Sequence, residues 1–353
     1  MTHKQIGWDT VAAGIAISFV TAVKVPMIPP PVVAMVIGAV ASPIIQPGFG
    51  FGAEIFFYLM LPPIILRSGL QFKWAPLNGV WKTTLLLSIV ATIFSSFIIF
   101  TGCSLLTTEG HTKCLRLGSV LSSTDPIATV ALMKHAHVQD HIKHVLQGEA
   151  LTNDAVAAML THAAEKQQWS ASSAVLDIIV GILISISVGS VGGYACGGFS
   201  NTITVLGIAT TLYALCEILQ ASGILCIFLF AITSRWRQQS KQMEDFVNIV
   251  ADLADLYCMF AVGAEIVFIT GRAFVTATVL FLSAMAARIV SVQVLARLTG
   301  EKWTFSELFT LGIAGARGTL AYALARSVGA DTGPIVLCVV LLSTAFNFIV
   351  LVL

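Results

Sequence analysis

Two acidic segments lie inside otherwise apolar sequence, and their carboxylates are the side chains best suited to chemistry. The first is SSTDP at residues 122–126, and the second, about one helix later, is GEALTND at residues 148–154. A charged side chain at the centre of a bilayer costs a few kcal/mol, so an acidic residue in such a span indicates an ion or proton pathway. The two segments therefore predict a transporter.

The second segment provides a carboxylate that can bind two competing ligands. Asp154 follows Asn153 and precedes the apolar residues 155–160. Burial there disfavours the ionised carboxylate, so a proton and a cation compete for the same group. One carboxylate that serves both ligands gives exchange. The structural alternative is a packed hydrogen bond for Asp154, and for Asp125 it is a helix N-cap in a loop.

Proline and glycine predict two interrupted helices at matching places in the two halves of the chain. Residues 125–126 break the fifth apolar span, and the glycines within residues 312–318 loosen the twelfth. Paired broken helices in corresponding positions are typical of the midplane site of a transporter. The two halves show no clear sequence similarity, so the repeat is inferred from spacing.

A helix that is interrupted within the membrane carries partial charges at both of its new ends. Asp125 in one break and Arg317 in the other are predicted to neutralise the opposed half-helix ends. Carbonyl groups freed near Ser123 and Thr124 are predicted to face a desolvated cation. With Asp154, the two breaks would form one site.

The composition is that of a multi-pass membrane protein. Of 353 residues, 57% are hydrophobic and 10% are charged, and the mean hydropathy is +0.90. Helix-spanning apolar runs include residues 81–100, 174–194, 275–295 and 335–353. We predict an all-α polytopic fold of roughly thirteen transmembrane helices, built as two inverted six-helix repeats with discontinuous crossing helices. A formal net charge of +1 argues against nucleic-acid binding.

The basic loops, the cysteines and the histidines are interpreted structurally. Lysine and arginine concentrate near residues 67–82, 134–143, 235–241 and 297–302. These loops are predicted to be cytoplasmic, with the N-terminus outside. The seven cysteines show no framework spacing, and those in the apolar runs are interpreted as packing residues. His137 and His141 have the i, i+4 spacing of a metal site, but we interpret them as part of a solvated cytoplasmic loop.

Five short segments follow one another in a recognisable order. They are LPPIIL at 61–66, STDP at 123–126, GEALTNDA at 148–155, ASGIL at 221–225 and GARG at 315–318. Together they resemble the sodium/proton exchanger family, the electroneutral cation/proton antiporters with an Asn-Asp pair. A single TDP or ND would be a weak signal, whereas these five matches in register span nearly the whole chain.

The resemblance implies a role for each residue that matches. Asp154 would bind the cation and the proton in alternation, and Asn153 would hold the neighbouring polar position. Asp125 and Thr124 would lie in the unwound crossing. The exchange would be one cation, Na⁺ or else K⁺ or Li⁺, for one proton, with no cofactor, no bound metal and no enzymatic reaction.

Glu149 is expected to form a buried ion pair that orients the site helix. Arg288 in the eleventh span is the first choice of partner, and Arg317 is the second. The resemblance also implies that residues 1–353 form a single transmembrane exchanger domain with no soluble regulatory domain. In such a domain a core bundle slides as an elevator against a dimerisation scaffold. A homodimer in the plasma membrane is expected.

The chain departs from the family pattern in three places. Arg67 stands where the family usually has an acidic residue, and Ala150 stands where it commonly has a serine. Asp252 and Asp255 in the tenth span are either extra ion ligands or the polar end of a helix, and we favour the helix end. Arg67 and Ala150 motivate an alternative, a transport-inactive homologue with a scaffolding or sensing role.

Two other classes of protein fit the sequence less well. An intramembrane enzyme would need a nucleophile or a metal motif, and neither Gly-x-Ser-x-Gly nor His-Glu-x-x-His occurs in the chain. A channel would need a filter motif repeated around a pore. A single deep acidic site suits alternating access better.

Overall fold

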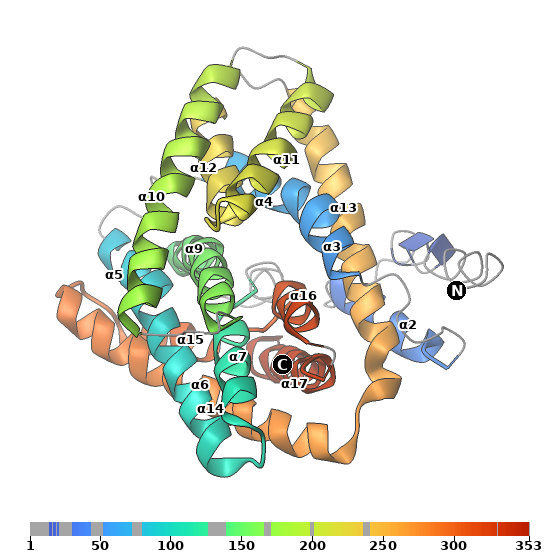
Figure 1. Cartoon of the computed structure of the whole chain (residues 1–353), viewed down its shortest axis with the longest axis vertical. Coiled ribbons are helices and arrows are strands. Elements are labelled where there is room, and N and C mark those ends of the chain that lie inside the picture. The colour runs from blue at the N-terminus through green and yellow to red at the C-terminus, as the bar shows by residue number, and fades with distance from the viewer. Residues whose placement is uncertain are drawn as a thin grey trace.

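The computed structural model describes residues 14–15, 17–18, 20, 30–43, 52–72, 80–125, 139–165, 171–197, 201–235, 241–329 and 331–352. Within these ranges the chain is helical and contains no strand (Figure 1). Pro126, Lys134 and His137, which entered the sequence analysis, lie outside the described residues.

The first half of the chain contains mostly short helical elements. They are α2 (Pro30–Ala41), α3 (Ala53–Ile55), η1 (Phe56–Met60), α4 (Leu61–Gln71), α5 (Trp81–Leu86), η3 (Leu87–Ala91), α6 (Thr92–Leu106), α7 (His111–Val120) and the long α9 (Asp140–Glu165). The second half continues with α10 (Ala171–Cys196), α11 (Thr202–Ile218), α12 (Gly223–Arg235), α13 (Lys241–Ala264), η4 (Glu265–Phe268), α14 (Gly271–Thr299), α15 (Phe305–Ile313), α16 (Thr319–Val328) and α17 (Gly333–Val352).

Six continuous helical segments in the described part are long and apolar enough to cross a membrane. They cover residues 53–71, 81–106, 175–196, 241–264, 271–299 and 333–350. Each of the four apolar runs predicted from the sequence coincides with one of these segments. An all-helical membrane architecture is therefore confirmed.

Two of these segments contain a π-helical turn. In the helix over residues 53–71, η1 ends two residues before Pro62, which is followed by Pro63. The wider turn accommodates the missing proline donors, so the helix continues to Gln71. In the helix over residues 81–106, η3 lies beside α9.

Packing divides the described helices into two groups. In the α13 group, α13 packs against α2 and α4, and α12 packs against α4, α10 and α11. In the α14 group, α14 packs against α6, α15 and α17, and α7 packs against α6, α9 and α16. Figure 1 shows the α13 group from α10 on the left, over the top, to α13 and α2 on the right, and the α14 group at the centre and bottom. α9 also contacts α10 and α12, so it lies at the boundary between the groups.

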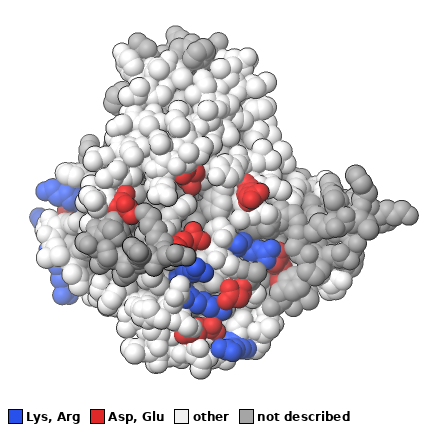
Figure 2. Space-filling view, in the orientation of Figure 1, with Lys and Arg blue, Asp and Glu red and all other residues white. Residues whose placement is uncertain are grey.

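The surface of α10 suits a lipid environment. Its exposed apolar side chains include Leu176, Leu183 and Val191, which are 61%, 59% and 68% exposed. Figure 2 shows that the upper part of this face, over α10 and α11, displays no charged side chain among the described residues. On the opposite side, Gly189 and Gly193 lie directly against the backbone of α12, the close packing that small residues at this spacing allow.

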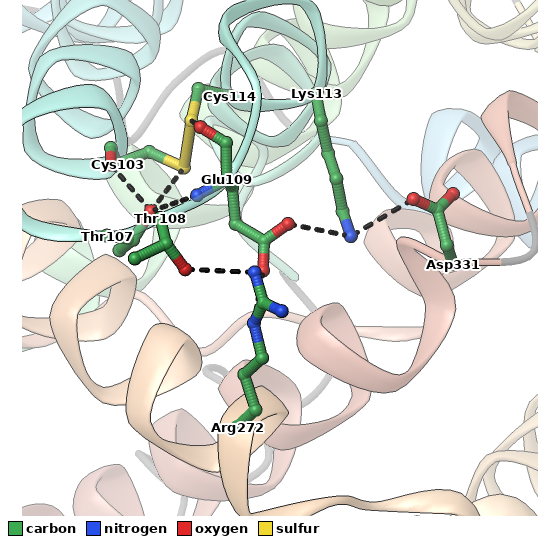
Figure 3. Close-up of a disulfide and its surroundings, with 8 residues drawn as sticks. All are labelled: Cys103, Thr107, Thr108, Glu109, Lys113, Cys114, Arg272 and Asp331. Carbon is green, nitrogen blue, oxygen red and sulfur yellow. Dashed lines mark hydrogen bonds and ion pairs between the residues drawn. A yellow bond between two sulfur atoms is a disulfide. The ribbon is translucent and has the colours of Figure 1, made fainter.

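One interpretation of the cysteines is corrected by the structure. Cys103 at the end of α6 and Cys114 in α7 form a disulfide (Figure 3), although they stand eleven residues apart with no framework spacing. Beside it, Glu109 and Lys113 form an ion pair. Cys258 and the other cysteines of the apolar runs remain free, and most of them are buried as packing residues.

Candidate functional site

The two predicted helix breaks meet at the centre of the α14 group. α7 ends at Val120 and is followed by non-helical residues 121–125, while the chain between α15 and α16 is non-helical over residues 314–318. The two segments join directly, because the backbone N–H of Asp125 donates to the carbonyl of Ala316 at 2.7 Å. Backbone groups freed by one break are thus satisfied by the other.

Opposite charges lie at the opposed half-helix ends. The guanidinium of Arg317 donates from Nη1 to the carbonyls of Ser122 (3.0 Å) and Ser123, just beyond the C-terminal end of α7. The carboxylate of Asp125 lies directly against Gly318, which precedes the first residue of α16. Each charge therefore offsets the partial charge of the nearer helix end. The Ser123 carbonyl, which was predicted to face a cation, accepts a hydrogen bond from Arg317. A cation would therefore not be its only partner.

Glu149 and Arg288 form a buried, two-pronged ion pair between α9 and α14. Nη1 of Arg288 lies 2.6 Å from Oε1 of Glu149, and Nη2 lies 2.9 Å from Oε2. Nε of Arg288 donates to the carbonyl of Leu311 at the end of α15. Arg288 rather than Arg317 is thus the partner of Glu149, and the pair fixes α9 to the helices around the breaks.

One helical turn beyond Glu149, Asn153 joins α9 to the first break. Its amide Nδ2 donates to the hydroxyl of Thr124 at 2.6 Å. Both residues line a very small polar cavity of about 10 Å³, together with Glu149, Arg288 and η3. The Oδ1 atom of Asn153 is buried and has no hydrogen-bond partner among the described residues.

Asp154 lies on a different face of α9, because one residue turns the helix by about 100°. Its side chain is 5% exposed and borders a second cavity of about 30 Å³. Asp125 and the hydroxyl-bearing Ser123 line the same cavity, and its apolar wall comes from η1, α4 and α16. This volume is sufficient to hold a water molecule. The structure thus divides the four predicted ion-binding residues between two cavities.

The far wall of this cavity contains an acidic residue that the sequence analysis placed at a helix end. Asp255 of α13 is 8% exposed and lines the cavity, while the side chain of Asp252 is 71% exposed. Arg67 of α4 forms ion pairs with both. Both residues lie in the middle of α13 (Lys241–Ala264), so the helix-end interpretation is wrong for both, and of the two only Asp255 lines the cavity. Ala150 is buried and brings no oxygen to either cavity.

Of the two histidines with helical spacing, His141 lies within the described residues and His137 lies outside them. His141 lies 3.0 Å from Glu307 and near the ring of Trp303, at the end of the bundle where α15 begins. Within the described ranges no group of three His, Cys, Asp or Glu side chains is placed to hold a metal ion.

The arrangement can hold a small cation or protons. The carboxylates of the buried Asp154 and the partly buried Asp125 both line the same small cavity, and a serine hydroxyl adds a neutral oxygen. Hard monovalent cations prefer such oxygen ligands. Fold and site together define a helical, multi-pass membrane protein with a pair of crossed, broken helices and carboxylates beside the crossing.

Comparison with known proteins gives the family. The profile of the family "Sodium/hydrogen exchanger, transmembrane" matches residues 11–352, and the chain belongs to this family. The Na(+)/H(+) exchanger beta of Oncorhynchus mykiss is 23% identical over 332 residues, which cover 83% of this chain and 43% of that protein. Sodium/hydrogen exchanger 9 of Homo sapiens is 27% identical, over 78% of this chain and 50% of that protein. The chain thus spans about half the length of these curated relatives.

A solved structure has the same fold. The sodium proton antiporter MjNhaP1 from Methanocaldococcus jannaschii at pH 8 aligns with a TM-score of 0.83, at 20% sequence identity, over 98% of this chain and 98% of that chain. The family predicted from the five sequence segments is therefore confirmed, as is the overall helical fold.

Proposed function

We propose that this chain exchanges a monovalent cation for protons across a membrane, with Asp154 as the group that binds them in alternation. The observation that carries the proposal is the position of Asp154. It is buried, it lines a small cavity beside the crossed helix breaks, and Asp125 lines the same cavity. A carboxylate in this setting is stable when it holds either a proton or a cation. Membership of the exchanger family and the likeness to a sodium proton antiporter support the same assignment.

The neighbouring residues complete the proposed site. Asp125 and Ser123 are the further ligands at the cavity, while Asn153 and Thr124 hold the crossing in place. The buried Oδ1 of Asn153 can accept a hydrogen bond when the adjacent site is protonated or hydrated. Glu149, Arg288 and Arg317 are structural: they position α9 and neutralise the helix ends.

The two helix groups correspond to the moving parts of the proposed mechanism. The α14 group contains both breaks and Asp154, so it is the core that carries the ion, and the α13 group is the scaffold against which it slides. Residues 1–353 then form one exchanger domain of about thirteen spans in two inverted repeats, paired as a homodimer. Na⁺ is the proposed cation, with K⁺ or Li⁺ as alternatives, and the plasma membrane is the proposed location.

Cation-driven proton flux in reconstituted liposomes tests this function. A lumenal pH dye follows the response to imposed Na⁺, K⁺ or Li⁺ gradients. Wild-type protein is expected to give flux that a membrane potential does not change, because one cation for one proton moves no net charge. Asp154→Asn is expected to abolish the flux, whereas Glu165→Gln, at the exposed end of the same helix, is expected to retain it.

A second function has one specific observation in its favour. Arg67 places a fixed positive charge in contact with Asp255 at the cavity wall, and Ala150 brings no hydroxyl. A transport-inactive homologue with a scaffolding or sensing role fits these features. Well-folded wild-type protein that shows no flux with any of the three cations would favour it over exchange.

A further inference from the structure

The seam between α4 and α13 has a row of polar contacts that leads from the end of the bundle to the ion cavity. Gln71, at the last position of α4, donates to Asn248 at 2.8 Å. One turn further in, Arg67 lies 2.5 Å from Asp252, and it also reaches Asp255. Because the two helices run in opposite directions, successive contacts follow the same seam inward. The row ends at Asp255, which lines the cavity of Asp125 and Asp154.

The exposure of these groups indicates that water reaches into the seam. Asp252 stands eleven residues after Lys241, about 16 Å along α13 from its start. Its side chain is nevertheless 71% exposed, whereas Asp255 is buried one turn deeper. An exposed carboxylate at this depth is expensive in lipid, and it normally faces a water-filled space. The seam therefore has the properties of an aqueous access route.

Arg67 stands at the inner end of this route and has two acidic partners. Its Nη1 contacts Asp252 and its Nη2 contacts Asp255, so one guanidinium bridges the exposed and the buried carboxylate. If Nη2 releases Asp255, the contact with Asp252 still holds the arginine. Asp255 can thus exchange its guanidinium partner for a cation without leaving Arg67 unpaired, which would be costly.

We propose that the α4–α13 seam is the access route of the transported monovalent cation, and that Asp255 and Arg67 form its selective gate. The cation reaches the cavity by displacing the Arg67 guanidinium from Asp255, while Asp252 retains the arginine. Asp255 is thus a specificity-determining residue, and Arg67 is a tethered cation that competes with the substrate. This inference rests on the proposed exchange function, since it concerns the path to the same cavity.

The test compares the cation concentration that gives half-maximal flux in three variants. Arg67→Gln removes the competitor, so this concentration should fall about tenfold, equivalent to about 1.4 kcal/mol. Asp255→Asn removes the charge that attracts the cation, so it should rise about tenfold. Asp252→Asn leaves Arg67 to Asp255 alone, so it should rise by a smaller factor, about threefold. Lys113→Gln breaks ion pairs at another place in the bundle and should change it less than twofold.

A purely structural clamp between α4 and α13 makes a different prediction. Losing either partner of a clamp loosens the same seam, so Arg67→Gln and Asp255→Asn would shift the concentration in the same direction or leave it unchanged. Either result overturns the proposal. If Arg67→Gln does not fold, Arg67→Lys replaces it. The lysine keeps the charge but lacks the planar fork whose two nitrogens contact Asp252 and Asp255 separately, so it competes less well for Asp255 and the concentration should still fall.

A binding measurement separates this proposal from the proposed function. The rise in unfolding temperature on adding Na⁺, K⁺ or Li⁺ to purified protein reports binding without transport. If wild type gives flux but Arg67→Gln and Asp255→Asn do not shift the cation concentration in opposite directions, the gate is overturned and exchange stands. If these two variants shift cation binding in opposite directions but no flux occurs, the gate stands and exchange is overturned. The absence of both binding and flux overturns both.

Discussion

The buried pair of Glu149 and Arg288 allows a quantitative test of how the site is held together. Glu149→Gln keeps the size of the side chain, removes its charge and leaves the guanidinium of Arg288 without a contacting counter-charge. Glu149 is 1% exposed and Arg288 is 7% exposed, so solvent screens neither group. Hydrogen bonds to charged groups contribute about 1.5–3 kcal/mol each, and two are lost or weakened. Breaking a buried pair by removing one partner costs about 3–5 kcal/mol.

The assay is thermal or denaturant unfolding of the purified protein. Glu149→Gln should lower the stability by about 3–5 kcal/mol. The double variant Glu149→Met with Arg288→Met should recover much of this loss, because no charge remains buried alone. Glu165→Gln, at the exposed end of α9, should stay within about 0.5 kcal/mol of wild type. Near-wild-type stability of Glu149→Gln, or a double variant as unstable as both single losses added, would refute the reasoning.

Two further predictions follow from contacts around the site and at the end of the bundle. Gly318→Ala places a methyl group on the carboxylate of Asp125, so it should destabilise the protein by about 1–3 kcal/mol and reduce flux. The control is Gly312→Ala, whose added methyl group would lie 3.5 Å from its nearest neighbour, Ile289. This variant should change neither stability nor flux. The hydrogen bond from Lys113 lowers the pKa of the exposed Asp331, so this carboxyl adds stability above the ordinary pKa of about 3.8, and the contribution is lost as the pH falls through the lowered value. Asp331→Asn should therefore cost less than about 1 kcal/mol at neutral pH, and unfolding measurements should show the difference from wild type shrinking as the pH falls below the ordinary pKa; a difference that does not shrink there would contradict it.

The helix breaks were predictable because their causes are local. An Asp-Pro pair and closely spaced glycines disfavour helix wherever they occur, and both breaks have charged residues that suit the exposed helix ends. The partner of Glu149 was also accessible, since Arg288 is an arginine inside an apolar helix and needs a buried acid. In each case a single residue type already limits its possible neighbours.

The division of the polar residues between two cavities was not predictable in the same way. Asn153 and Asp154 are adjacent in sequence, but Asn153 shares the face of Glu149 and Asp154 does not. Helical spacing separates the two faces, yet only the packing of α9 decides that one faces α14 and the other α4. The contact between Arg67 and Asp255 was not predictable either, because the spacing of Asp252 and Asp255 in the sequence does not indicate which side chain of α4 lies opposite them.

The disulfide between Cys103 and Cys114 was not predicted, because a separation of eleven positions identifies no cysteine framework and the pairing depends on the turn between α6 and α7. The disulfide gives information on the orientation of the chain in the membrane, because disulfides form in oxidising compartments. The basic loops that were predicted to be cytoplasmic do not include the turn between α6 and α7. Near it Arg272, at the start of α14, donates to Thr108 at 2.9 Å, so this turn lies at the α14 end remote from Arg297 and Lys302 (Figure 3). The turn should therefore face outside, opposite the basic loops.

Cysteine labelling in sealed cells or vesicles of known orientation tests this orientation. Because Cys103 and Cys114 are themselves buried, the labelled site is Thr108→Cys at an exposed position of this turn, in a variant whose five free cysteines are replaced by alanine. A membrane-impermeant maleimide added outside should label it, and the same variant without Thr108→Cys should give no signal. Closing the short loop is expected to stabilise the protein by about 2–3 kcal/mol, so reduction should also lower the unfolding temperature. Labelling that appears only after permeabilisation would place this turn in the cytosol and reverse the predicted direction of every span.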